Sequence, residues 1–359
     1  MKRILIRRLL DLAPAPGNPR SSEGAFFTKP DGEMLFVYSR FKGSDAADNA
    51  AADLCLLSSR DGGERFENPR ILFTCGEDGA KNIMSVSLLP MENGDIGLFY
   101  LVRRTDALMQ MVLRRSADGG ATWGERVLCT PKEGRFVVNN DRVVRLSDGS
   151  ILIPAAFHPG TEGIGPEEAA LFFRSRDDGR SWEELPGCCR LEGLSASRSG
   201  LQEPGVIELS PGRLWGWART DLGRQYQFVS NDGGESWSQP EPSQFTAPLS
   251  PLSMKRGPDG RLYAVWNPVP LYNGRSAFSG SAWTGGRTPL VIAASGDNGR
   301  TFGEPAVLED NPGAGYCYCA MHFTERGLLL GYCAGGEEDG SCLARTRLSL
   351  IPAGELSRI

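Results

Sequence analysis

The chain has 359 residues, a formal net charge of -5 and 40% hydrophobic residues, a composition typical of a folded globular protein. This acidic balance provides no basic field for binding nucleic acid. No run of about 18 apolar residues is present, which argues against a membrane-spanning helix. The 45 glycines and 24 prolines indicate a turn-rich, all-β fold.

The N-terminal segment and the cysteines bear on location and metal binding. Arg7 and Arg8 interrupt the apolar stretch near the N-terminus, which is then too short for the core of a signal peptide. Nine cysteines form an odd number without paired Cys-x-x-Cys spacing, and only two histidines accompany them. We therefore expect a cytoplasmic protein with reduced cysteines, no metal and no cofactor.

The predicted elements, taken in chain order, are six β-hairpins, each with a polar residue or proline before a glycine at its turn. They span Glu23 to Arg40, Ser85 to Arg103, Asn140 to His158, Glu203 to Arg219, Pro251 to Asn267 and Tyr318 to Cys333. In the last unit, Leu343 to Leu350 is expected as a third strand, and Ile4 to Leu10 as the outer strand beside it. Such a pairing would join both termini in one sheet and leave no open edge.

A short phrase of the form Ser-x-Asp-x-Gly-x-Thr-Trp follows five of these hairpins. Its copies, some ending in Phe, begin at Ser59, Ser116, Ser175, Ser230 and Ser295. Asp accepts hydrogen bonds from its own turn, Gly tolerates positive φ, and the closing aromatic ring can lock the turn in place. A repeat of about 50 to 60 residues with such a turn predicts a β-propeller. We expect one six-bladed propeller domain over residues 1–359.

Stacking the hairpins on their turns places polar side chains at one end of the propeller. The inner strands begin at Glu23, Ser85, Asn140, Glu203, Pro251 and Tyr318. The second strands end near Arg40, Arg103, His158, Arg219 and Asn267. Carboxylates, a tyrosine and arginines are therefore expected around one mouth of the central channel. Polar groups that converge in a concavity suit a site that processes glycans.

The turn phrases resemble the Asp-boxes of the sialidase (neuraminidase) superfamily, over nearly the whole chain. The segment from Gln202 to Leu209, with Arg219 beyond it, looks like the sialidase segment that supplies a glutamate and an arginine. The segment from Tyr316 to Ala320 looks like the one that supplies the tyrosine nucleophile, and the strand alignment selects Tyr318. The resemblance implies a retaining exo-glycosidase acting on a terminal acidic sugar such as sialic acid.

The implied chemistry explains these residue types. Sialic acid carries a carboxylate on its anomeric carbon, so a neutral tyrosine approaches it more easily than an anionic nucleophile does. Glu203 would take the proton of Tyr318, which then forms a covalent glycosyl-enzyme. Arg219 and further arginines would clamp the carboxylate. A mobile aspartate would protonate the leaving oxygen; Asp45, Asp48 and Asp53 lie in the expected loop, and we favour Asp48.

The chain departs from the sialidase pattern in its first unit. The usual Phe/Tyr-Arg-Ile/Leu-Pro motif, which supplies a clamp arginine, is absent, and Glu23 stands in its neighbourhood. Arg40 and Arg142 are the candidates to replace that arginine. The fifth unit should supply another clamp arginine, and Arg275 and Arg287 compete for this role.

Two further residues complete the predicted substrate site. Asp141 belongs to the segment Asn139 to Arg142, which resembles a less-described bacterial branch of sialidase-like proteins, and His158 ends a second strand. Two other functions stay open. One is a lyase or hydrolase on a uronic-acid glycan that uses Arg142, His158 and Tyr318. The other is a propeller that binds an acidic glycan or a protein partner without turnover.

Overall fold

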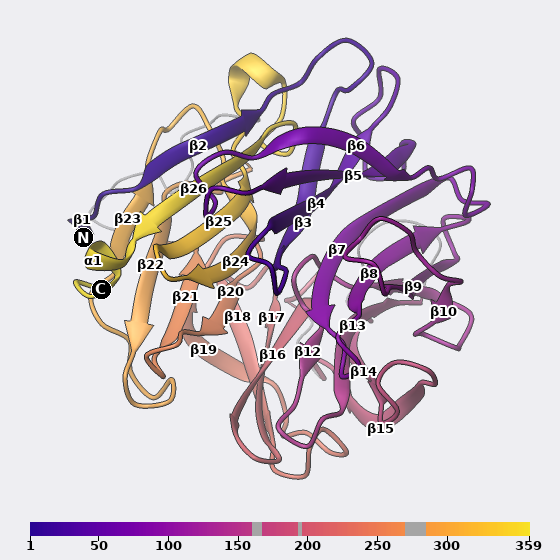
Figure 1. The fold of residues 1–359 in the computed structure, drawn as a ribbon. Helices are drawn as coiled ribbons and strands as arrows, with labels where there is room; N and C mark the ends of the chain where they lie inside the picture. The colour runs from indigo at the N-terminus through magenta and orange to yellow at the C-terminus, as the bar shows by residue number, and fades with distance from the viewer. Residues whose placement is uncertain (160–166, 193–195, 270–284) are drawn as a thin grey trace.

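The computed structural model describes residues 1–159, 167–192, 196–269 and 285–359, and the fold is all-β. Its strands form mainly antiparallel sheets that are arranged around a common centre (Figure 1). Within the described ranges, no helix is both long and apolar enough to cross a membrane.

The first half of the chain forms one four-stranded sheet and a larger one. The four-stranded sheet contains β3 (Ser21–Thr28), β4 (Met34–Phe41), β5 (Ala52–Ser59) and β6 (Glu67–Phe73). The larger sheet begins with β7 (Asn82–Pro90), β8 (Ile96–Arg103), β9 (Met109–Ser116) and β10 (Val127–Leu128). It continues with β11 (Arg135–Val137), β12 (Val144–Arg145), β13 (Ile151–His158), β14 (Ala169–Ser175) and β15 (Glu183–Cys189). A single parallel pair, Arg135 with Met109, joins its two halves.

The second half of the chain forms three more sheets. One contains β16 (Gln202–Ser210), β17 (Arg213–Arg219), β18 (Arg224–Ser230) and β19 (Glu241–Thr246). The next contains β20 (Ser253–Arg256), β21 (Leu262–Trp266), β22 (Leu290–Ser295), β23 (Ala306–Glu309) and β1 (Lys2–Arg3). The last contains β24 (Cys317–Thr324), β25 (Gly327–Cys333), β26 (Thr346–Pro352) and β2 (Arg7–Leu12), and a short helix α1 (Ala353–Leu356) follows β26.

The six expected hairpins are confirmed, each as an antiparallel strand pair. The expected pairing of the N-terminal strand with the last unit is present as well, because β2 pairs with β26 from Arg7 opposite Leu350 onward. The first residues do something the sequence did not indicate: β1 pairs in parallel with β23 of the neighbouring sheet. The N-terminal segment thus bridges two sheets, and both termini lie close together (Figure 1).

The five turn phrases form the same hydrogen-bonded structure. In the fourth copy, Asp232 Oδ1 accepts from the Ser230 hydroxyl (2.7 Å) and the Ser236 amide (3.0 Å), while Ser230 Oγ accepts from the Gly234 amide (2.8 Å). The closing ring reaches beyond its own sheet, since Trp237 stacks on Phe172 of the preceding sheet at 4.3 Å between centroids. These rings therefore contribute to the apolar contacts between neighbouring sheets.

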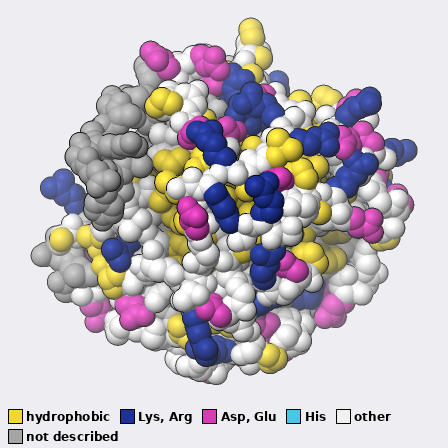
Figure 2. Space-filling view, turned by 90° about the vertical axis from the view of Figure 1, so that its left-hand side faces the viewer, with side chains coloured by type: hydrophobic (Ala, Val, Ile, Leu, Met, Phe, Trp, Pro, Cys, Tyr) yellow, Lys and Arg dark blue, Asp and Glu magenta, His cyan; other side chains and the backbone are white. Residues whose placement is uncertain are grey.

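The surface gives no sign of a large single-charge patch on the face shown in Figure 2. Lysine and arginine side chains are interspersed there with aspartates and glutamates. Such a mixed distribution provides no basic surface for a polyanion on this face.

Candidate functional site

A strained backbone position recurs where the inner strands begin. Glu23, Ser85, Asp141, Glu203 and Tyr318 all have φ between 46° and 59°, in the left-handed region that non-glycine residues seldom adopt. At four of these residues the pairing with the next strand also shifts register, which is the signature of a β-bulge. The four bulged strands are β3, β7, β16 and β24. A bulge redirects a side chain from the sheet face, and bulges are common beside active sites.

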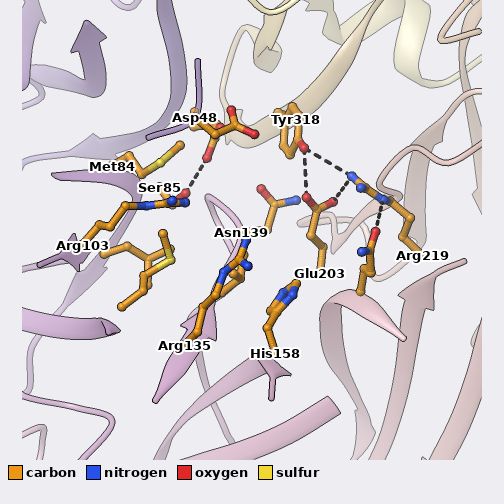
Figure 3. Close-up of a pocket in the computed structure, with 15 residues that line it drawn as sticks. Asp48, Met84, Ser85, Arg103, Arg135, Asn139, His158, Glu203, Arg219 and Tyr318 are labelled. Carbon is orange, nitrogen blue, oxygen red and sulfur yellow. Dashed lines mark hydrogen bonds and ion pairs between the residues drawn. The ribbon is translucent and has the colours of Figure 1, made fainter. Parts of the chain in front are cut away.

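Four of these five residues line one cavity of about 130 Å³, shown in Figure 3. Its polar lining residues are Glu23, Asp48, Ser85, Arg103, Arg135, Asn139, His158, Gln202, Glu203, Arg219 and Tyr318. Met84, Leu101, Met109 and Val137 supply its apolar wall. The strand alignment thus brings sequence-distant polar groups together, as expected. It does not do so for Asn140 and Pro251, which do not line the cavity.

Tyr318, Glu203 and Arg219 form a hydrogen-bonded triad on one side of the cavity (Figure 3). The Tyr318 hydroxyl donates to Glu203 Oε1 at 2.9 Å, and Arg219 Nη1 donates to Glu203 Oε2 at 2.8 Å and to the tyrosine oxygen at 3.3 Å. Burial and the Glu203 carboxylate hold the pKa of Tyr318 well above its usual value. The tyrosine is therefore neutral at rest, with a carboxylate placed to accept its proton and an arginine placed to stabilise the resulting oxyanion.

A second cluster is organised by Arg20, which is 1% exposed. Its guanidinium donates to Glu23 Oε1 (3.0 Å), to Asp48 Oδ1 (2.5 Å) and to the Ser22 hydroxyl (3.0 Å). Ser85 donates to the other oxygen of Glu23. Burial raises the pKa of Glu23 to about 7 although Arg20 acts against this shift. Burial acts in the same direction on Asp48, but Arg20 outweighs it and the pKa of Asp48 lies below its usual value.

Arg287 contacts the Tyr318 ring from outside the cavity lining. Its guanidinium carbon lies 5.4 Å from the ring centroid, and Nη1 donates to Cys317 Sγ at 3.1 Å. Burial alone would raise the pKa of the Cys317 thiol, but hydrogen bonds from Cys333 and Cys342 and the charge of Arg287 bring it well below its usual value. Of the two fifth-unit arginines, Arg287 therefore lies at the tyrosine. Arg275 lies outside the described residues.

Three polar contacts connect His158, which lines the cavity, to Arg219 of the triad. His158 Nδ1 lies 2.6 Å from Glu168 Oε1, and Glu168 Oε2 accepts from Gln202 at 2.7 Å. Gln202 in turn accepts from Arg219 Nε at 3.0 Å. These contacts fix the orientation of Arg219. They also link the predicted site residue His158, which lines the cavity, to the triad.

Three predicted substrate-binding residues do not line this cavity. Arg40, on β4, is not among the residues that line the cavity. Burial raises the pKa of Tyr38 and of Cys55, and the charge of Arg40 acts against both shifts. Arg142 donates to the Leu252 carbonyl at 2.5 Å and lies over Trp217, 5.6 Å from the ring centroid.

Asp141, although strained like the cavity residues, makes a cross-link between sheets. It accepts from Lys255 Nζ at 2.6 Å and from the Met321 amide at 2.9 Å. With Arg142 it lines a separate hollow. Both residues are held by contacts to β20, β24 and the loop before β20, which pull them away from the site, so sequence position alone misplaced them.

Of the three aspartates considered as the acid, Asp45, Asp48 and Asp53, one lines the cavity. Asp45 accepts from the Ala47 amide at 2.9 Å, and Asp53 accepts from the Cys75 amide at 2.8 Å and pairs with Lys42. Neither lines the cavity, whereas Asp48 does. The loop position of Asp48 therefore agrees with the residue that the sequence favoured.

Sequence reasoning missed two arginines that line the cavity, Arg103 and Arg135, and one behind it, Arg20. Arg20 precedes the first hairpin and carried no motif signal, although its guanidinium organises Glu23 and Asp48. Arg103 was in the strand-end alignment but was not selected as a site residue, and Arg135 lies in the short strand β11, which no hairpin signal indicated. A lone arginine in a connection gives no signal until the fold shows where it points.

Comparisons with known proteins agree with this architecture. A family model described as a BNR repeat-like domain matches residues 76–330. An anhydrosialidase from Macrobdella decora is 24% identical over 232 residues, which cover 59% of this chain and 27% of that protein. The chain spans less than half the length of the curated relatives it matches.

Two solved structures share the fold over 96% of this chain. The Hadza microbial sialidase Hz136 superposes with a TM-score of 0.72 at 18% identity, over 67% of its own length. A protein of unknown function from Dyadobacter fermentans superposes with a TM-score of 0.71 at 17% identity, over 99% of its length. At such identities the superposition shows a shared fold, and the chemistry has to be argued from the site itself.

Proposed function

The chain belongs to the sialidase-like superfamily of BNR-repeat proteins, and on this basis we propose that it is a retaining exo-glycosidase that removes a terminal acidic sugar from a glycan. One observation carries the proposal: the hydroxyl of Tyr318 donates to Glu203 and accepts from Arg219 inside a cavity. A tyrosine that is half-buried, neutral and joined to its own base is arranged for nucleophilic attack.

The proposed reaction has two displacements. In the first, Glu203 takes the phenolic proton as Tyr318 Oη bonds to the anomeric carbon and the bond from that carbon to the leaving oxygen breaks. In the second, water attacks the same carbon and gives a proton to Asp48, which has protonated the leaving oxygen, while the bond to Tyr318 breaks and Glu203 returns the phenolic proton to Tyr318. Two inversions give net retention. Arg219, and Arg287 over the tyrosine ring, would stabilise the phenolate.

The proton for the leaving oxygen would come from the carboxyl pair that Arg20 joins. Asp48 is the expected acid, but its ion pair with Arg20 favours the ionised form. Glu23, with a pKa of about 7, is the carboxyl that holds a proton near neutral pH. We assign the proton to Glu23 at rest. Asp48, whose side chain is 67% exposed, would take over this proton and donate it to the leaving oxygen.

The architecture supports one ring of six blades formed by residues 1–359. The larger sheet consists of two four-stranded antiparallel units that the short strand β11 joins, so six such units follow in chain order. We propose that these are the blades of a six-bladed β-propeller, closed by the pairing of β2 with β26. The cytoplasmic location stays a prediction from the sequence.

Turnover of a fluorogenic α-sialoside, followed for wild type, Tyr318→Phe and Glu203→Gln, tests the reaction. Both variants should lose activity by about 10³-fold or more, since the nucleophile and its base act as a unit. Tyr226→Phe is the matched control: Tyr226 is a buried tyrosine on β18 that does not line the cavity. NMR of the first-formed sugar should show the retained anomer. An inverted product, or full activity in Tyr318→Phe, refutes the mechanism.

The two alternative functions make different demands on the same cavity. A lyase that used Arg142, His158 and Tyr318 together finds no support, because Arg142 lies in a separate hollow from the other two. A non-catalytic glycan-binding protein would bind an acidic sugar equally well in wild type and Tyr318→Phe and would release no product from any glycoside.

A further inference from the structure

Arg103 is a buried arginine whose hydrogen-bonding capacity is unused among the described residues. It lies at the end of β8, is 8% exposed and lines the cavity. Its Nε is buried without a hydrogen-bond partner, and its ion pair with Asp106 spans 3.7 Å to a half-exposed carboxylate. A buried guanidinium normally satisfies its donors, because leaving them unpaired is costly.

The neighbours of Arg103 make its charge still less favourable. Arg135 lies on the same side of the cavity (Figure 3). Burial, together with the like charge of Arg135, lowers the pKa of Arg103, although Asp48, Asp106 and Glu23 act in the opposite direction. Two guanidinium groups thus face one cavity, and no carboxylate of the described residues lies within hydrogen-bonding distance of Arg103. An anion placed between them would relieve this repulsion.

Three other arginines at the site, Arg20, Arg219 and the half-buried Arg287, are engaged by protein groups. Arg20 donates to Glu23 and Asp48, Arg219 donates to Gln202 and Glu203, and Arg287 donates to Cys317 and a main-chain carbonyl. Arg103 therefore differs from them in having its donors available to a ligand. We propose that Arg103 anchors an oxyanion substituent of the bound sugar, at a position away from the carbon that Tyr318 attacks.

The position of Arg103 in the cavity indicates where on the bound sugar the acidic group lies. Figure 3 places Arg103 and Arg135 on one side and Tyr318, Glu203 and Arg219 on the other. The strongest charge effects on Tyr318 come from Glu203, Arg219, Arg287 and Glu23. The corresponding effects on Arg103 come from Arg135, Asp48, Asp106 and Glu23, so the two ends of the cavity are electrostatically distinct.

A sugar that spans this cavity would carry its acidic group remote from the reacting carbon. A hexuronic acid, with its carboxylate on the far side of the ring, and a sugar 6-sulfate both have this chemistry, and a guanidinium binds either oxyanion in the same bidentate way. Met84, Leu101 and Met109 would face the apolar parts of the ring. The inference rests on the proposed function for the glycan nature of the ligand, and the anion site itself is independent of turnover.

Binding of inorganic sulfate, measured by isothermal titration calorimetry, tests the anion site. Wild type and Tyr318→Phe should bind sulfate alike, and Arg103→Gln should raise its Kd by about 10- to 100-fold through loss of charge-assisted hydrogen bonds. Arg300→Gln, at an exposed arginine on a turn far from the cavity lining, should leave the Kd unchanged. Arg103→Lys keeps the charge without the planar fork and should give an intermediate Kd. Equal sulfate affinity in wild type, Arg103→Gln and Arg103→Lys, or no sulfate binding at all, overturns the proposal.

Thermal unfolding without sulfate separates a ligand-binding role from a structural one. Because the buried charge of Arg103 is only partly compensated by Asp106 and its other acidic neighbours, Arg103→Gln should raise the Tm in sulfate-free buffer and abolish the further rise on adding sulfate. An arginine that merely held the fold would show the reverse, a lower Tm with the sulfate effect retained, and this result also overturns the proposal.

Competition distinguishes the two sources of the oxyanion and separates this inference from the proposed reaction. Glucuronic acid and glucose 6-sulfate are titrated against Tyr318→Phe, with glucose as the uncharged control. If one of the two acids binds to Tyr318→Phe and its binding is lost on adding Arg103→Gln, the group it carries, carboxylate or sulfate, is the oxyanion that Arg103 binds. This conclusion holds even if no glycoside is hydrolysed. If both acids bind no better than glucose, the anchor assignment is wrong, whatever the outcome of the sialoside assay.

Discussion

Replacing Glu23 by glutamine should remove a pH dependence of folding stability. Glu23 is 6% exposed, accepts from Arg20 and Ser85, and has its pKa raised to about 7 by burial. In the unfolded chain this carboxyl titrates near 4.5. The folded protein therefore binds the Glu23 proton more tightly than the unfolded chain does.

The expected size follows from these two pKa values. Stability from this group is fully present below pH 4.5, declines as the pH rises, and is lost above about pH 7. A shift from 4.5 to about 7 corresponds to about 3 kcal/mol, at 1.36 kcal/mol per pKa unit. Glutamine keeps the size and a hydrogen-bonding oxygen but does not ionise, so its free energy of unfolding should lack this decline.

Urea denaturation at several pH values between 4 and 8 measures the difference between wild type and Glu23→Gln. Subtracting the two curves cancels every other titrating group. Glu67→Gln, at an exposed glutamate on β6, is the control and should track wild type. A difference between wild type and Glu23→Gln that stays constant with pH would falsify the assignment of a raised pKa to Glu23.

Further predictions concern other parts of the molecule. Burial and Lys255 lower the pKa of His322 to about 4, so its contribution to stability is lost as the pH falls from 6.5 toward 4, and His322→Gln should weaken that decline in the same urea series. Arg219→Met should reduce the free energy of unfolding by about 3 kcal/mol, because it strands the Glu203 carboxylate, and should also lower kcat/KM; unchanged stability contradicts this. Asp232→Ala should cost about 1 to 2 kcal/mol in urea denaturation through lost turn hydrogen bonds, with KM unaffected. Gly205→Ala should lower the Tm, since a Cβ there would lie 2.3 Å from the Trp217 ring.

Local chemistry made much of the fold predictable. Asp and Gly in the repeated turns have few alternative structures, and the spacing between the turns determines where each hairpin begins and ends. Counting back from the turns then put Glu203 and Tyr318 at the same level of their strands, and their hydroxyl–carboxylate contact of 2.9 Å agrees with that alignment. The roles of these residues stay proposals until activity is measured.

The same counting misplaced residues whose direction depends on other sheets. Arg142 and Asp141 sit at the expected level, but a carbonyl before β20 and the amide of Met321 hold them in a separate hollow. Arg40 lies near the end of β4, at the level that Arg103 occupies on β8. Arg103 lines the cavity and Arg40 does not, and the charge of Arg40 acts on Tyr38 and Cys55. Strand register predicts the height of a side chain, and the neighbouring sheets decide which way it points.

The sequence by itself determined the six hairpins, their turns and the strand levels, since these depend on residues close together along the chain. Only the tertiary structure decided the electrostatics of the cavity. The raised pKa of Glu23, the pairing of Asp48 with Arg20 and the unused donors of Arg103 all arise from burial and from groups far apart in sequence. Desolvation and charge proximity are properties of a position in space, and no local pattern of residues encodes them.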